Sequence, residues 1–248
     1  MPRQLLIDDH IEYRGEALHR SNVDGPQMET KRHDFDRFTG ITLDTTNRWA
    51  ASGDNQLAGT SDTIAISEVQ GGSCLITTGT VDNDSCYMSS AIIYSAAKRA
   101  VVEWRIKIVD VSGVALFVGF TDAKYEANNS LAIHYPDDVA TYVAANCAGF
   151  VIDADHSTSS IMCASVKVTN TTPVDSGVDW ADNETKTLRV ELDTAGKAVF
   201  YLGGVAVGAI ASAITAATLL CATVQAMTRA DDGANTVYVL SYDAWQDN

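Results

Sequence analysis

Residues 101–108 have the sequence Val-Val-Glu-Trp-Arg-Ile-Lys-Ile, and from position 102 onward their side chains alternate between apolar and charged. The apolar set is Val102, Trp104, Ile106 and Ile108, and the charged set is Glu103, Arg105 and Lys107. Because successive side chains of a β-strand point to opposite faces, this pattern places all the charges on one face. The stretch predicts a half-buried antiparallel strand.

The same alternation returns at 188–193, where Leu188, Val190 and Leu192 are the apolar positions. A turn-like segment at 194–197 follows, and then residues 198–202 and 205–207 flank the pair Gly203-Gly204. Glycine adopts the positive φ values that a tight hairpin turn requires. The region therefore predicts a strand followed by a β-hairpin.

Residues 114–120 are apolar at consecutive positions, which is typical of a central strand covered on both faces. Further candidate strands are 73–78, 88–94, 149–153, 160–169, 219–228 and 236–245. Residues 209–217 fit either a short helix or a connecting loop. Many short strands separated by turn residues predict an all-β fold of two antiparallel sheets packed as a sandwich.

Composition excludes several classes of protein. The 248 residues carry 17 Lys and Arg against 32 Asp and Glu, a net charge of −15 that would repel a nucleic acid. Five scattered cysteines without a C-x-x-C pair argue against both a disulfide framework and a zinc site. No phosphate-binding or dinucleotide-binding glycine motif occurs, so we expect no cofactor. The uncharged stretch 198–228 alternates and contains glycines, so we expect strands there and not a membrane span.

Residues 1–37 differ from the rest because they contain 6 basic and 8 acidic residues and few apolar ones. We expect an extended N-terminal arm at 1–37 and a folded body at 38–248. The arm is either a disordered tail, or a segment that docks on a neighbouring subunit or on its own body. Its candidate partner-binding residues are the apolar ones, Leu5, Leu6, Ile7, Ile11 and Tyr13.

Several segments resemble concanavalin A-like jelly rolls, the fold of certain lectins and glucanases. The stretch 187–208 is similar to the late hairpin of that fold, and 237–245 looks like its closing strand. Residues 38–49, the pair Gly71-Gly72 and residues 118–123 look like segments of jelly-roll virion proteins of tailed bacteriophages. The resemblance implies a jelly-roll sandwich over about residues 38 to 247.

This resemblance also implies a role, because such domains commonly decorate or cement a capsid or sit on a fibre. We therefore expect a non-enzymatic virion structural protein, assembled in the host cytoplasm and bound to capsid or other virion proteins. We also expect a homo-oligomer, with a trimer favoured, and no nucleic-acid or membrane partner. The alternative is a carbohydrate-binding, lectin-like module on a phage fibre or capsid surface.

The glucanases of this fold carry Glu-x-Asp-x-x-Glu on one strand, so that a nucleophile and a general acid face one groove. The nearest match here begins at Glu191-Leu-Asp193, but Gly196 stands where the second glutamate belongs. Both acids also flank the apolar Leu192 and lead into a turn. We therefore interpret them as a solvated strand face and predict no catalytic residues.

Two further features have the residue types of a binding site. The acidic segment Asp153-Ala-Asp155-His156-Ser157 has oxygen donors, but a calcium loop of the EF-hand type needs glycine at its sixth position and glutamate at its twelfth. The sequence has Thr158 and Ala164 there, so we expect an ordinary acidic turn and no metal. Trp180 lies in a polar stretch and is a possible glycan or interface contact.

Overall fold

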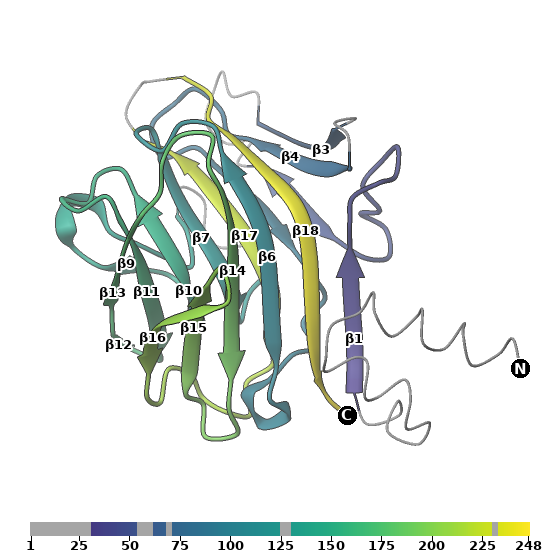
Figure 1. The fold of residues 1–248 in the computed structure, drawn as a ribbon, viewed down its shortest axis with the longest axis vertical. Coiled ribbons are helices and arrows are strands. Elements are labelled where there is room, and N and C mark those ends of the chain that lie inside the picture. The colour runs from purple at the N-terminus through teal and green to yellow at the C-terminus, as the bar shows by residue number, and fades with distance from the viewer. Residues whose placement is uncertain (1–30, 54–61, 68–70, 125–129, 230–232) are drawn as a thin grey trace, which may run out of the picture.

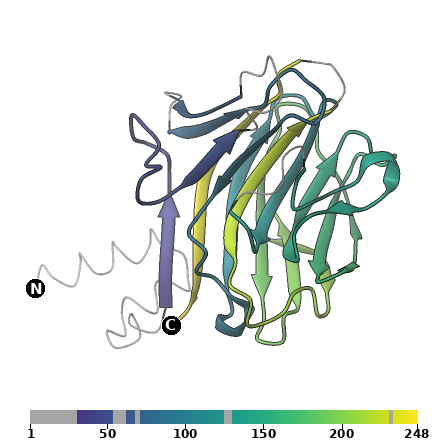
Figure 2. The ribbon, with the colours of Figure 1, turned by 180° about the vertical axis from the view of Figure 1, so that it is seen from behind.

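The structure is a computed structural model that describes residues 31–53, 62–67, 71–124, 130–229 and 233–248, and it builds two antiparallel sheets that face each other (Figure 1). The view from behind shows the sheet that lies at the back in Figure 1 (Figure 2). The expected all-β sandwich is confirmed. None of the described residues forms a helix long and apolar enough to cross a membrane.

The first sheet, called sheet A, has eight strands and contains both alternating stretches. Its strands, in spatial order, are β16 (Val205–Ile210), β15 (Ala198–Leu202), β14 (Thr185–Leu192), β6 (Val101–Ile108), β18 (Thr236–Asp247), β4 (Ser73–Thr77) and β3 (Thr63–Ser67). The eighth strand, β1 (Lys31–Asp36), pairs with the second half of β18. The β15–β16 hairpin turns through Gly203 and Gly204 at φ of 56° and 84°, as the sequence predicts.

The second sheet, called sheet B, also has eight strands. Its strands are β12 (Asn170–Thr171), β11 (Ser160–Lys167), β10 (Asn146–Asp153), β7 (Val114–Thr121), β17 (Cys221–Thr228), β5 (Ser85–Ser89) and β2 (Ala50–Gly53), with β13 (Val174–Asp179) paired to β11. The short strands β8 (Ile133–His134) and β9 (Thr141–Tyr142) form a separate pair. The described residues also form two 3₁₀ turns, η2 (Ala96–Lys98) and η3 (Pro136–Asp138), and residues 211–217 are a connecting loop.

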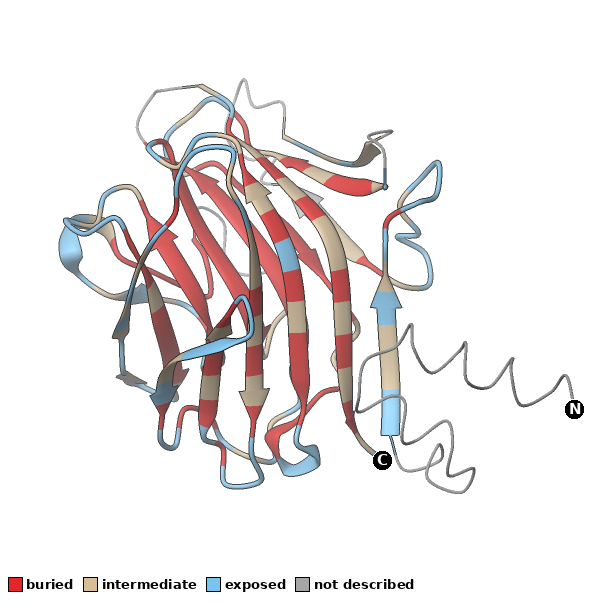
Figure 3. Cartoon of the chain, in the orientation of Figure 1, coloured by how far each residue is buried: buried red, intermediate tan, exposed pale blue. Residues whose placement is uncertain are grey.

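The two sheets are buried differently, as the banded strands of sheet A in Figure 3 show. Along β6 and β18, buried residues alternate with half-buried or exposed ones, so one face of sheet A meets water. Every residue of β7, β10 and β17 is buried. Alternate residues of these strands belong to two separate apolar clusters, one between the sheets and one on the outer face of sheet B.

Aromatic rings fill the core between the sheets. Trp49 lies 4.9 Å from Tyr242 and 6.0 Å from Trp104, measured between ring centroids, and Trp104 lies 4.6 Å from Tyr242. The hydroxyl groups of Tyr94 and Tyr242 form a 2.7 Å hydrogen bond across the core. This bond satisfies two polar groups that burial would otherwise penalise.

The last residues of the expected arm belong to the body. Strand β1 pairs along its whole length with β18, so of the alternatives for residues 31–36 the structure supports docking on the chain's own body. Asp36 accepts a 3.0 Å hydrogen bond from the indole of Trp49, and Arg48 bonds Asp34 at 2.9 Å. The candidate residues Leu5, Leu6, Ile7, Ile11 and Tyr13 lie outside the described residues.

Gly119 on β7 and Gly149 on β10 lie opposite each other, and there is no room for a side chain at Gly119. A Cβ on Gly119 would lie 2.3 Å from the carbonyl oxygen of Ala148 and 2.5 Å from the Cα of Gly149, both of them backbone atoms. We expect Gly119→Ala to lower the free energy of unfolding by about 2 kcal/mol or more, measured by urea denaturation. Gly40→Ala, where the nearest atom is 3.5 Å away, is the control. Equal stability of the two variants would contradict this packing.

Candidate functional site

A buried ion pair lies at one end of sheet B, where β10 and β17 end. Arg229 directly follows β17, and its guanidinium donates to both carboxylate oxygens of Asp153, the last residue of β10, at 2.8 and 2.6 Å. Arg229 is 2% exposed and Asp153 is 5% exposed. Such a bidentate pair is geometrically specific, and removing one partner would leave a buried charge uncompensated.

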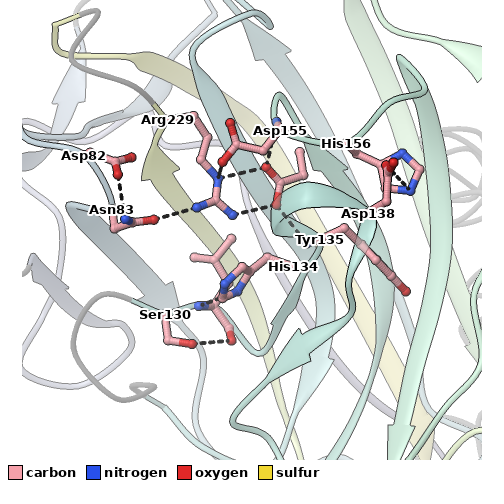
Figure 4. A network of polar contacts seen from close by, with 11 residues as sticks. Asp82, Asn83, Ser130, His134, Tyr135, Asp138, Asp155, His156 and Arg229 are labelled. Atoms are coloured by element: carbon pink, nitrogen blue, oxygen red, sulfur yellow. Dashed lines mark hydrogen bonds and ion pairs between the residues drawn. The ribbon is translucent and has the colours of Figure 1, made fainter.

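The surroundings of this pair satisfy its remaining hydrogen-bonding groups (Figure 4). Arg229 also donates to the side-chain oxygen of Asn83 at 2.5 Å. The Asp153 carboxylate accepts further bonds from the backbone N–H of Tyr135 at 2.8 Å and of Asp155 at 3.2 Å. Both carboxylate oxygens of Asp153 are therefore held by hydrogen bonds from the protein itself.

His134 lies beside this pair, on β8, and is buried. Burial lowers the pKa of His134 to about 4, and the nearby Arg229 charge acts in the same direction, against the smaller opposing effect of Asp153. Its Nδ1 accepts a 3.4 Å hydrogen bond from the backbone N–H of Leu131. The ring is therefore neutral at pH 7 and serves as an acceptor that shapes the segment before it.

The surface end of the network holds Asp155, Asp138 and His156. Burial raises the pKa of Asp155, although Arg229 at 3.3 Å opposes that shift. Asp138 accepts a 2.6 Å bond from the backbone N–H of Ser157, which lowers its pKa. His156 Nε2 lies 3.7 Å from Asp138, and its ring meets Tyr135 edge-on. These contacts fix the loop after β10. They do not gather a metal-binding set, because no three His, Cys, Asp or Glu side chains cluster for a metal within the described residues.

The outer face of sheet B is filled by the chain itself. Residues 130–144, which contain β8 and β9, lie over this face. The apolar side chains between them are Leu131, Ala132, Ile133, Tyr135 and Ala144 from the covering segment, and Tyr87, Ala115, Phe117, Cys147, Val151, Ala164, Val166 and Met227 from the sheet. We call residues 130–144 the cover segment.

Two buried polar side chains of the sheet hold the cover segment in place. Gln225 on β17 accepts a 2.7 Å hydrogen bond from the backbone N–H of Ala132. Tyr87 on β5 donates a 2.9 Å hydrogen bond to the carbonyl oxygen of Ser130. With the bond from Tyr135 to Asp153, these contacts tie the cover segment to three different strands of sheet B.

Glu191 and Asp193, the nearest match to the glucanase motif, lie away from this region. Glu191 lies on the outer face of sheet A, where Arg189 contacts it at 3.1 Å. Asp193 begins the β14–β15 turn and accepts hydrogen bonds from the backbone N–H groups of Ala195 and Lys197 at 2.8 and 2.9 Å. Asp193 therefore stabilises a turn, and Glu191 is a partly solvated strand residue.

Trp180 requires a correction. It is 3% exposed and packs in the core, and its indole N–H donates to the carbonyl oxygen of Glu184 at 3.1 Å. The polar residues around it in the sequence misled the prediction, because the apolar ring turns inward from a polar stretch. Its ring face is not available for stacking on a glycan.

Comparisons with known proteins bear on the fold. No family model matches the chain, and no curated protein sequence does either. A glycoside hydrolase family 16 endo-glucanase from Bacteroides ovatus superposes with a TM-score of 0.58 at 10% identity, covering 85% of this chain and 99% of that one. A Bacillus licheniformis β-glucanase gives 0.55 at 12% identity, covering 87% and 98%. A family 16 protein from Mycobacterium smegmatis gives 0.57 at 10% identity, covering 86% and 99%.

These likenesses show the concanavalin A-like jelly-roll fold and extend no further at such low identity. A protein of unknown function from Shewanella oneidensis matches to a similar extent, with a TM-score of 0.51 at 10% identity, over 88% of this chain and 87% of that one. The fold is therefore shared by hydrolases and by proteins without an assigned activity.

The sequence analysis missed the Arg229–Asp153 pair, although a signal was present. Arg229 is the first charged residue after the uncharged stretch 198–228. A lone arginine at the end of such a stretch requires a partner if the strand before it is buried. The sequence alone did not reveal that this partner would be Asp153, 76 residues away.

The buried His134 predicts a pH dependence of stability. In the unfolded chain a histidine titrates near pH 6.5, whereas in the fold the pKa of His134 is about 4. Between these values, acidification protonates this histidine in the unfolded chain but not in the folded one. The free energy of unfolding therefore decreases as the pH is lowered, by up to about 3 kcal/mol. We expect His134→Asn, which keeps an acceptor but cannot titrate, to lose less stability than the wild type between pH 7 and pH 4 in chemical denaturation. Equal losses would contradict the assignment.

Proposed function

We propose that this chain is a non-catalytic jelly-roll module with a structural place in a larger assembly, and that the assembly is the particle of a tailed bacteriophage. The filled outer face of sheet B carries the non-catalytic part of the proposal. A polymeric substrate needs an open groove lined by its catalytic groups, and the cover segment occupies this face with apolar side chains. The virion part rests on the segments at 38–49 and 118–123 that resemble phage proteins.

The placement of the acidic residues supports the same proposal. A retaining glycosidase needs two carboxyl groups about 5 Å apart across the substrate, one of them protonated. The Glu191-Leu-Asp193 segment supplies one carboxylate paired with Arg189 and another committed to a turn. Asp153, at the end of a central strand of sheet B, is neutralised by Arg229.

The second candidate, a carbohydrate-binding module, is favoured by the open face of sheet A. Tyr201, Tyr238 and Trp245 are half-buried there, between charged side chains. The guanidinium of Arg189 lies 4.3 Å from the Tyr201 ring centroid, and the Lys107 ammonium lies 5.6 Å from that of Tyr238. Aromatic rings next to charged groups suit the apolar faces and hydroxyl groups of sugars.

Hydrolysis is the first test. We expect the purified chain to release no reducing ends from laminarin or lichenan, because Glu191 is paired with Arg189 and Asp193 is committed to a turn. Affinity electrophoresis on the same polymers measures binding separately. Retardation that Trp245→Ala or Tyr201→Ala removes would favour the carbohydrate-binding candidate. Release of sugar that Glu191→Gln abolishes would overturn the non-catalytic proposal.

Attachment is the second test, and the structure sets where the arm must be cut. We expect deletion of residues 1–30 to leave the thermal midpoint unchanged but to remove the protein from purified particles, as measured by mass spectrometry. Deletion of residues 1–37 should also lower the midpoint, because it removes β1 and the Asp36 partner of Trp49. Incorporation of the 1–30 deletion at wild-type occupancy would show that attachment depends on the body.

A further inference from the structure

Among the described residues, strand β1 forms one edge of sheet A. It pairs with β18 on one side, and no strand among the described residues pairs with its other side. A strand edge with unpaired N–H and C=O groups is a template for another strand. At the end of β1 the carbonyl oxygen of Phe35 accepts a hydrogen bond from Arg48, so a partner strand cannot use this oxygen and pairs chiefly with residues 31–34.

The sequence of β1 is Lys31-Arg32-His33-Asp34-Phe35-Asp36, with basic residues first and acidic residues last. An antiparallel partner with the same sequence would therefore meet it with opposite charges. In a regular antiparallel pair, opposite residues both point their backbone groups toward the partner or both away from it. When a strand pairs with its own copy, the two-fold axis must therefore pass at a residue and not between two residues. Only then do the two residues of each opposite pair point their backbone groups in the same way.

Among the central registers only the one centred on His33, which sets the two His33 side chains opposite each other, places no Lys, Arg, Asp or Glu opposite a like charge. It places Arg32 opposite Asp34 of the second copy, twice, and Lys31 opposite Phe35. A register centred on Arg32 or on Asp34 sets that charged residue against its own copy. Opposite charges across strands stabilise a pair and like charges destabilise it, so the sequence selects one register.

We propose that two copies of this chain pair through their β1 edges in this register, so that sheet A continues across a two-fold axis at His33. The charges on β1 discourage pairing with unrelated strands and permit pairing with a copy. Phe35, 41% exposed in the single chain, gains cover from the aliphatic stem of Lys31 of the second copy.

The overall charge favours this edge as the meeting point. Copies with a net charge of −15 repel each other, but residues 31–37 contain three basic and two acidic residues. A two-fold contact occupies the β1 edges of both copies, so no third copy can pair there. It therefore predicts a dimer in place of the trimer expected from the family resemblance.

The test measures the mass of the full chain by light scattering and sedimentation. We expect a particle of twice the 26.5 kDa chain. Arg32→Asp places an aspartate opposite Asp34 of the second copy, and Asp34→Arg places an arginine opposite Arg32. Each variant alone should therefore dissociate, with a Kd raised about tenfold or more. An equal mixture of the two variants restores opposite charges at both positions and should dimerise again.

The mixture separates pairing from misfolding, because Asp34→Arg also removes the contact with Arg48. Lys197→Asp, an exposed change of equal charge in the β14–β15 turn, is the matched control and should remain dimeric. A monomeric or trimeric wild type, single variants that remain dimeric, or a mixture that stays monomeric would each overturn the proposal. Dissociation of the control would also overturn it, since general repulsion would then explain the effect.

Discussion

Burial of sheet B on both faces is the constraint on which the rest of the structure depends. Strands β7, β10 and β17 have no exposed residue, so a second layer must cover their outer face. The chain supplies that layer from the cover segment, 130–144. Because the layer is part of the same chain, the outer face of sheet B becomes a second hydrophobic core.

Sheet A, in contrast, keeps one face open to solvent. Its outer face is solvated, and charged residues of neighbouring strands lie opposite each other on it. In one such row, Glu103 lies between Arg189 on one side and Asp243 on the other. The long strand β18 organises this sheet, because it pairs with β6 along one side and with β4 and β1 in turn along the other. An antiparallel sheet with one solvated face is a suitable support for an interface, since its backbone is fixed by the core behind it.

The sequence predicted those parts of the fold that follow from local patterns. Alternation identified β6 and β14, the glycine pair identified the β15–β16 hairpin, and the continuous apolar run identified β7 as a central strand. Contacts between distant segments were not predicted, because alternation shows that a face is buried and does not show what buries it. The cover segment is one example, and the docking of β1 on β18, more than 200 positions away in the chain, is another.

The distribution of acidic residues explains how so negative a chain folds without gathering a charged site among the described residues. Asp153 is neutralised by Arg229, Asp193 caps a turn, and Asp34 is bound by Arg48. Glu103 and Asp243 do lie opposite each other, and burial raises the pKa of Glu103. Arg189 and Arg37 flank these two acids and oppose that shift. Each of these carboxylates is thus tied to a nearby donor or cation, so the negative charge is divided among separate local contacts.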